Sequence, residues 1–118
     1  MRVQLHPAYV LHARPYRETS QLLELLTRDH GRVGAVARGA RGRGGGLQPF
    51  RPLLVSWSGR GELKTLGHSE GAGSPLGLEG RALLHGFYLN EVMMRLSHRD
   101  DPNPRAFAAY DRALVGLA

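Results

Sequence analysis

Guanidinium groups are the side chains in this sequence whose type and spacing point most directly to a chemistry. Residues 31–50 read GRVGAVARGARGRGGGLQPF, and no Asp or Glu occurs between Arg32 and Arg60. Arginines separated by glycines stay exposed, and such a segment suits a polyanion better than a small neutral molecule. We therefore predict a positively charged loop. A flexible linker with merely solvated arginines is the alternative interpretation.

The positive charge is concentrated in the first part of the chain. The 118 residues carry 16 Lys or Arg and 10 Asp or Glu, a net charge of +6. Residues 1–70 account for all of this excess, whereas residues 71–118 are neutral. A binding surface confined to the first part is expected. All cations but Lys64 are arginines, which suit phosphate, although a coding bias toward Arg explains this equally well.

Nine cations in the predicted strands and loops of this part form the candidate DNA-binding set: Arg14, Arg17, Arg32, Arg38, Arg41, Arg43, Arg51, Arg60 and Lys64. The aromatic residues between them, Tyr16, Phe50 and Trp57, are candidates for base stacking. For Trp57 the competing interpretation is core packing, because a small barrel needs large side chains. For Phe50 the two interpretations are balanced, and for each arginine a solvated position is the alternative.

Catalytic and metal-binding patterns are missing from the sequence. It has no Cys, and its six His never fall two or four residues apart, so we expect no metal site. Lys64 follows Leu63, which does not fit a Walker A motif, and no serine lies in a nucleophile elbow. We predict a binding protein with no catalytic residue and no cofactor. The first residues lack the apolar core of a signal peptide and no apolar run is of membrane-spanning length, so a soluble intracellular protein is expected.

Five strands are predicted from apolar alternation and turn signals, at residues 8–16, 20–28, 32–38, 53–58 and 62–69. In the first strand Tyr9, Leu11 and Ala13 are expected to share a face, and Pro15 to end regular pairing or mark a bulge. Residues 20–28 are predicted as a strand because a hairpin turn follows. A helix is the alternative there, since Leu and Glu favour helices.

Two helices are predicted after the Gly-rich break at residues 71–75. Residues 78–97 carry an apolar stripe at helical spacing, composed of Leu84, Tyr88, Val92 and Leu96, with Leu83, Phe87 and Met93 beside them. Asn103 as N-cap and Pro104 at the first helical position open the second helix, whose stripe is Phe107, Tyr110, Leu114 and Leu117. The stripe runs to the end of the sequence, so we expect a fragment or a surface that packs on something else.

Five short strands followed by helices predict a mainly β fold: a five-stranded OB-fold barrel with a helical extension. We expect an OB-fold DNA-binding domain at residues 1–75 and the truncated start of a helical domain at residues 76–118. OB-folds bind oligonucleotides on one sheet face and the adjoining loops.

The order of several short motifs resembles the bacterial recombination mediator RecO. These are residues 9–20 (YVLHARPYRETS), Thr27 to Val33, ARGAR at 37–41, LQPF at 47–50, GRGELKTL at 59–66 and YLNEV at 88–92. The resemblance covers about residues 8–96 and implies an N-terminal OB-fold followed by a helical domain. The family is usually about twice as long as this sequence.

The resemblance implies binding to single- and double-stranded DNA, annealing of complementary strands and, with RecR, loading of recombinase onto strands coated by single-strand-binding protein. It also implies a cytoplasmic, nucleoid-associated protein. Capture of the single-strand-binding protein, and a zinc site in some members, belong to the helical domain, of which this sequence holds only the start. The alternative is an interaction scaffold that docks RecR or another partner without contacting DNA.

Overall fold

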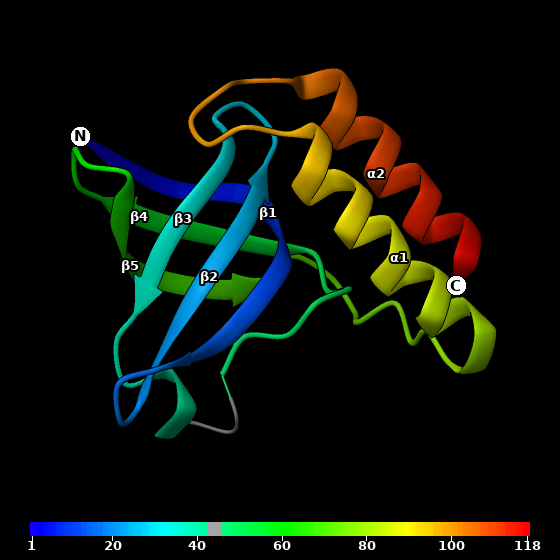
Figure 1. The fold of residues 1–118 in the computed structure, drawn as a ribbon, viewed down its shortest axis with the longest axis horizontal. Helices are drawn as coiled ribbons and strands as arrows, with labels where there is room; N and C mark the ends of the chain where they lie inside the picture. Colours follow the sequence, from blue (N-terminus) through cyan, green and yellow to red (C-terminus); the bar gives the residue numbers. More distant parts are fainter. Residues whose placement is uncertain (43–45) are drawn as a thin grey trace.

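The fold is a closed five-stranded barrel followed by two helices, as seen in a computed structural model that describes residues 1–42 and 46–118 (Figure 1). In chain order the elements are β1 (Arg2–Tyr16), β2 (Ser20–Thr27), β3 (Gly31–Ala37), the 3-10 turn η1 (Ala40–Gly42), β4 (Leu53–Ser58), β5 (Leu63–Gly71), α1 (Gly80–Leu96) and α2 (Pro104–Leu117). The predicted OB-fold barrel with a helical extension is confirmed.

The barrel closes in the order β1-β2-β3-β5-β4, with β4 returning to pair with β1. Most neighbours are antiparallel, and β3 and β5 form a short parallel contact between Gly34–Val36 and Leu63–Thr65. Residues 20–27 are a strand, so the helical alternative for this segment is wrong. In Figure 1, β2 and β3 cross in front of β4 and β5, which leaves their outer face open to the viewer.

Alternating residues of the strands fill the barrel. Leu53, Val55 and Trp57 of β4 point inward together, as their spacing predicts. They pack with inward side chains of β2 and β3, among them Leu23, Leu25, Val33, Ala35 and Ala37. Burial of this apolar surface is the main force that closes the barrel.

The longest strand, β1, departs from the predicted alternation. It begins at Arg2 rather than Ala8 and pairs with β2 through Pro15 and Tyr16, so Pro15 neither ends the pairing nor marks a bulge. The bulge lies between Val10 and His12. It moves Ala13 to the barrel side, away from the side that Tyr9 and Leu11 occupy.

That shift gives β1 two buried faces. Tyr9 and Leu11 pack against α1 and α2 in a second apolar cluster with Met93, Tyr110 and Leu114. The hydroxyl of Tyr9 also donates to Asp111 Oδ1 at 2.5 Å, and this bond joins β1 to α2. The helices are therefore fixed to the outside of the barrel along β1.

The two helices differ in how well their buried faces follow from the sequence. In α2, Tyr110 and Leu114 are buried as predicted, and the Asn103 side chain caps the helix by accepting from the amide of Ala106 at 3.1 Å. In α1, the predicted stripe is wrong: Leu84, Tyr88 and Leu96 are largely exposed. Its buried residues are Gly86, Asn90 and Met93, of which only Met93 was expected beside the stripe. Among the described residues, no helix is both long and apolar enough to cross a membrane.

Candidate nucleic-acid interface

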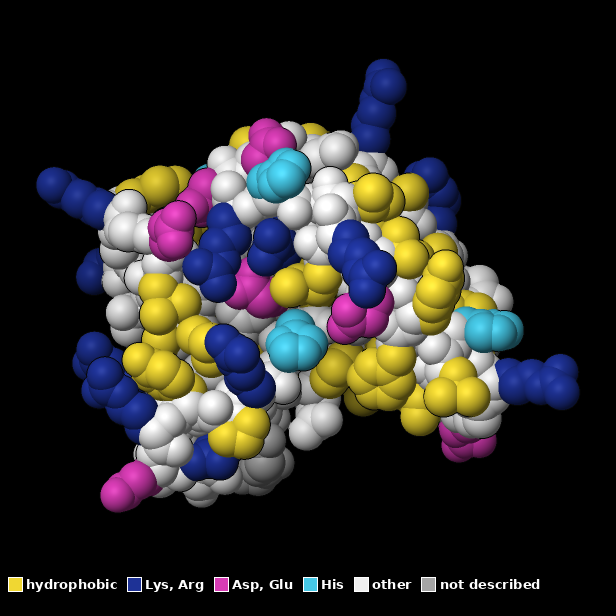
Figure 2. All heavy atoms as spheres, in the orientation of Figure 1, with side chains coloured by type: hydrophobic (Ala, Val, Ile, Leu, Met, Phe, Trp, Pro, Cys, Tyr) yellow, Lys and Arg dark blue, Asp and Glu magenta, His cyan; other side chains and the backbone are white. Residues whose placement is uncertain are grey.

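Three neighbouring strands, β1, β2 and β3, present a continuous outer surface, which we call the outer sheet face. It is formed by the outward residues His12, Arg14, Leu22, Glu24, Arg32, Gly34 and Val36. His12 lies opposite Glu24, and Arg14 lies opposite Leu22. Figure 2 shows Lys and Arg side chains over this sheet, with His and apolar side chains between them. This is the side on which OB-folds hold oligonucleotides.

The centre of the outer sheet face is a network of one carboxylate and two guanidinium groups. Arg32 Nη1 donates to Glu24 Oε1 at 2.5 Å, and Arg99 Nη2 donates to Glu24 Oε2 at 2.5 Å. Arg32 also donates from Nε to Ser97 Oγ at 3.1 Å. With one negative and two positive groups, the network keeps a net positive charge on the face.

The ionisation of Glu24 is controlled by these partners. Burial disfavours the carboxylate, but hydrogen bonds from Arg99 and Arg32 outweigh the burial and hold the pKa of Glu24 below its ordinary value. The same hydrogen bond raises the pKa of Arg99. The network therefore stays fully charged at neutral pH, and the Glu24 side chain, 9% exposed, is not available to repel a phosphate.

Two glycines allow the α1–α2 connector to reach this face. A Cβ atom on Gly34 would lie 2.7 Å from Arg99 Cζ, and a Cβ atom on Gly31 would lie 2.2 Å from the carbonyl oxygen of Asp101. The connector is held along β3 by a hydrogen bond from the amide of Asp100 to the carbonyl of Arg32, at 2.7 Å. Arg99 is thus part of the outer sheet face although it follows β3 by more than sixty residues.

A groove continues the outer sheet face past the β1–β2 turn. Its cavity volume is about 390 Å³. We call it the turn groove and define it by Tyr16, Arg17, Val36, Arg38, Leu63 and Thr65. The half-buried ring of Tyr16 carries the Arg17 guanidinium 5.2 Å from its centroid, within range of a cation–π contact. Arg38 directly follows β3, lines the same groove and is exposed.

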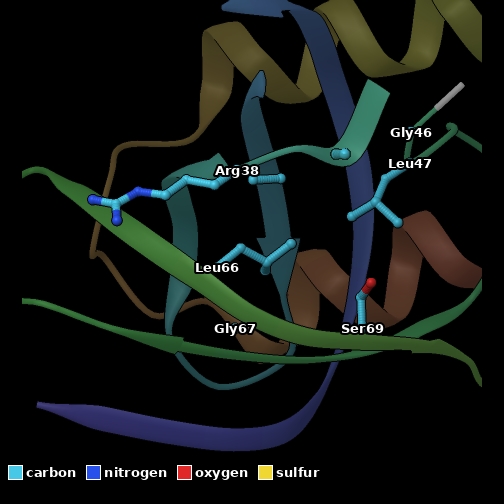
Figure 3. A pocket seen from close by; sticks show the side chains of 8 residues that line it. Arg38, Gly46, Leu47, Leu66, Gly67 and Ser69 are labelled. Carbon is cyan, nitrogen blue, oxygen red and sulfur yellow. The ribbon is translucent and has the colours of Figure 1, made fainter. Parts of the chain in front are cut away.

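The direction of Arg38 is visible in Figure 3, which views a neighbouring small cavity of about 160 Å³. Leu47, Leu66 and Arg38 are among the residues that line that cavity. The Arg38 side chain extends away from the other lining residues and ends free of them. Its guanidinium is therefore available to a ligand outside the barrel.

Arg14, Arg17 and Arg38 carry the free charge of this surface. Among the described residues, none of the three forms an ion pair. Unpaired guanidinium groups beside a half-buried aromatic ring and apolar side chains can bind phosphates while bases stack. The arrangement offers binding, and the described residues contain no group of three His, Cys, Asp or Glu side chains that could hold a metal.

Arg41 forms hydrogen bonds mainly with other parts of the protein. Its Nη2 donates to the backbone carbonyl of Arg17 at 2.9 Å and also to that of Glu18, and its own amide donates to the carbonyl of Thr19 at 2.9 Å. These bonds tie the β1–β2 turn to η1. Arg41 therefore positions the turn that carries Arg17.

Two other predicted cations lie away from the turn groove. Arg51 packs its guanidinium against Gly71, at the opposite end of β5 from Leu63. Arg60 lies exposed in the β4–β5 turn, beside a cavity at the barrel end that Trp57 and Met1 also line. Arg43 falls outside the described residues.

Three of the predicted contact residues are buried. Lys64 is 7% exposed, and its ammonium donates to the Gly61 carbonyl and lies 3.4 Å from Asp100 Oδ2. Phe50 is 7% exposed and packs between the barrel and α1, with its ring 5.0 Å from that of Phe87. Trp57 is 3% exposed and fills the barrel. Phe50 and Trp57 leave little ring surface for a base to stack on, whereas Lys64, although buried, lines the turn groove.

Arg99 is the residue of this surface that the sequence did not reveal. Its local context, His98-Arg99-Asp100, shows no pattern that differs from an ordinary solvated connector. The contact with Glu24 spans 75 positions and arises only when the helices dock on the barrel. Pairing of Arg32 with Glu24 could have been suspected only from their positions on adjacent strands.

The known proteins that this sequence resembles are consistent with the observed fold. Residues 1–75 match the family described as "Recombination protein O N terminal". Over 120 residues the chain is 57% identical to a protein named DNA repair protein RecO from Coxiella burnetii, covering 98% of this chain and 52% of that protein.

Relatives of the same name come from Methylococcus capsulatus, with 58% identity over 99% of this chain and 50% of the relative, and from Chromobacterium violaceum, with 55% identity over 99% and 49%. The chain thus spans about half the length of the curated relatives it matches.

Proposed function

The chain belongs to the RecO family, and from that premise we propose that it supplies the DNA-binding surface of a recombination and repair mediator. The single observation that carries the proposal is the set of free guanidinium groups, Arg14, Arg17 and Arg38, around the outer sheet face and the turn groove. On an OB-fold this side is the one that tracks an oligonucleotide backbone. The relatives are named as DNA repair proteins, which agrees with such a ligand.

In this proposal the barrel, residues 1–75, is the DNA-binding domain, and residues 76–118 are the start of the helical domain. Phosphates contact Arg14, Arg17 and Arg38, with Arg99 as a fourth cation on the face. Bases of a single strand stack on the Tyr16 ring beside Arg17. Arg41 contributes by holding the β1–β2 turn in place.

Strand annealing would follow from the same charges. Two DNA strands repel each other, and a cationic surface that holds both lowers this repulsion. We propose binding to single- and double-stranded DNA, annealing, and recombinase loading together with RecR, carried out without a catalytic step. Binding of single-strand-binding protein would fall to the rest of the helical domain. A cytoplasmic location near the nucleoid fits this ligand.

A titration of fluorescently labelled DNA with the 118-residue chain tests the proposal. We expect the anisotropy of both a single-stranded oligonucleotide and a duplex of the same length to rise at low salt. No change with either DNA form, from a chain shown to be folded by its circular dichroism, would contradict the proposal.

A protein-interaction scaffold is the second candidate. It is favoured by the exposed apolar side chains of α1, Leu84 at 68% and Tyr88 at 72%. In this case the arginines would meet an acidic protein such as RecR. Capture of RecR that survives nuclease treatment and high salt, from a chain that binds no DNA, would favour the scaffold over the DNA-binding surface.

A further inference from the structure

A cleft separates the barrel from α1 and opens beside the outer sheet face. It lies between β1, the segment of residues 47–49 and α1, and its cavity volume is about 450 Å³. Its apolar walls are Leu11, Ala13, Leu47, Pro49 and Phe87. The Phe87 side chain is 48% exposed, so one side of its ring is available to a ligand while the other packs against Phe50.

The deepest residue of the cleft has an unsatisfied polar group. Asn90 is 2% exposed, and its Oδ1 accepts a hydrogen bond from the Tyr110 hydroxyl. Its Nδ2, which can donate two hydrogen bonds, is buried without a partner. Buried donors are nearly always paired, so this one is satisfied only when the Asn90 amide turns toward a ligand in the cleft.

The cleft is continuous with the proposed path of DNA. His12 lines it and lies opposite Glu24 in the β1–β2 pair, and Arg14 follows two residues later on the same face of β1. A strand whose phosphate contacts Arg14 therefore passes the mouth of the cleft. The attached base is then within reach of the cleft interior.

The charge of the cleft selects between the parts of a nucleotide. Glu91 is the one carboxylate among its described lining residues, which include no Lys or Arg and have His12 as their other titratable side chain, so a phosphate is disfavoured. A nucleobase is neutral, offers carbonyl acceptors to Asn90 and a π-face to Phe87, and finds further polar groups in Gln48 and Glu91 at the rim.

We propose that the β1–α1 cleft receives one unstacked nucleobase from a DNA strand bound on the outer sheet face. The proposal rests on the DNA-binding function proposed above and adds a site to it. Bases within a duplex are paired and stacked, and moving one out of the stack costs energy. The cleft therefore favours single strands over duplexes.

Binding of a thymidine oligonucleotide is compared with binding of an abasic strand of equal length, at one salt concentration. We expect the native chain to bind the base-bearing strand about tenfold more tightly, as one well-stacked base allows. Because bases also stack on Tyr16, Phe87→Ala should lose the part of this preference that the cleft supplies and keep the part that Tyr16 supplies, while its affinity for the abasic strand stays unchanged. Tyr88→Ala is the matched control: its side chain is 72% exposed on the same helix and does not line the cleft, so the preference should remain.

Photo-cross-linking of the native chain with a 4-thiothymidine oligonucleotide gives a second readout that needs no variant. We expect cross-links on the tryptic peptide of residues 82–95, at Phe87 rather than at Tyr88. Cross-links confined to peptides that hold no residue of the cleft, or a base preference that Phe87→Ala leaves undiminished, would overturn the cleft as a base site.

The two proposals fail in different ways in this experiment. Equal and salt-dependent binding of the base-bearing and abasic strands by the native chain would overturn the cleft and leave the DNA-binding surface standing. Absence of binding to both strands would overturn the DNA-binding surface, and the cleft proposal with it.

Discussion

Arg41 donates a hydrogen bond from Nη2 to the backbone carbonyl of Arg17 at 2.9 Å, which ties the β1–β2 turn to η1. Arg17 has a positive φ of 57°, a conformation that is costly for a residue with a side chain. The hydrogen bond from Arg41 therefore holds a strained turn, and the guanidinium of Arg17 in that turn faces the turn groove. Within the proposed interface, one arginine positions another.

Replacing Arg41 tests this relationship. Arg41→Ala should lower the free energy of unfolding by about 1 kcal/mol, because it removes hydrogen bonds to two carbonyls. It should also loosen the turn, which hydrogen exchange reports as faster exchange of the Ser20 amide. Arg38→Ala is the control, since Arg38 is exposed and its removal should leave the exchange rate unchanged. Unaltered exchange in Arg41→Ala would contradict the bracing role.

Removing the three free cations tests where DNA binds. The triple variant Arg14→Ala, Arg17→Ala, Arg38→Ala should bind single-stranded DNA far more weakly. The slope of log K against log salt should fall by about 2, since each phosphate contact contributes about 0.7. Fluorescence anisotropy at several salt concentrations measures both quantities.

A matched triple variant separates local contacts from net charge. Arg51→Ala, Arg81→Ala and Arg105→Ala together remove the same charge from exposed sites outside the outer sheet face and the turn groove. This variant should keep most of the native slope of log K against log salt. Equal losses in the two triple variants would show that binding depends on overall charge rather than on this surface.

Glu24 should matter more for stability than for DNA binding. Glu24→Gln leaves two guanidinium groups without their counter-charge in a site where the carboxylate is 9% exposed. Breaking such a pair costs about 3 kcal/mol, which urea unfolding would detect. The folded variant should bind DNA at least as tightly as the native chain, because Arg32 and Arg99 are released toward phosphate. Weaker binding by the folded variant would contradict the placement of these arginines.

His6 should make stability depend on pH near neutrality. Burial and the nearby His30 lower the pKa of His6 below 6.5, while Asp29 opposes and Arg28 adds to this shift. Its Nε2 accepts from the Asp29 amide at 3.0 Å, and the His30 and Trp57 rings pack around it. The unfolded chain takes up the proton first, so this stability is present above pH 6.5 and is lost as pH falls below it.

Replacement of a second histidine is the control for this dependence of stability on pH. His6→Gln should flatten the fall in unfolding free energy between pH 7 and pH 5.5, whereas His12→Gln, at an exposed site, should not. Glu24 affects stability in a separate pH range. Because its pKa is also lowered by folding, its contribution to stability is lost as the pH falls below the ordinary pKa of about 4.5. A native chain with no loss of stability across pH 6.5 would contradict the role of His6.

The barrel could be predicted because its strands obey local rules. Leu53, Val55 and Trp57 alternate cleanly, and each turn carries Gly or a polar residue. The face of α1 could not be predicted. Small and polar residues make the close contacts of this helix: Gly86 lies against Phe50 and Leu78, and Asn90 bonds to Tyr110 of α2, so several larger apolar side chains point outward.

The composition of the candidate site could be predicted from the sequence, but its geometry could be predicted only in part. Excess charge indicated the barrel, and Arg14, Arg17 and Arg38 are exposed there with no ion pair among the described residues. The burial of Lys64 depends on Asp100, and the position of Arg99 depends on Glu24, both contacts between distant segments. No local pattern encodes such contacts, because they form when the α1–α2 connector docks on β3.

The central claim is that phosphates bind the cations of the outer sheet face and the turn groove. Its most direct test is a titration of single-stranded DNA with the native chain from low to moderate salt. With about four phosphate contacts, log K should fall with log salt at a slope near −3. Binding that does not change with salt would contradict the account.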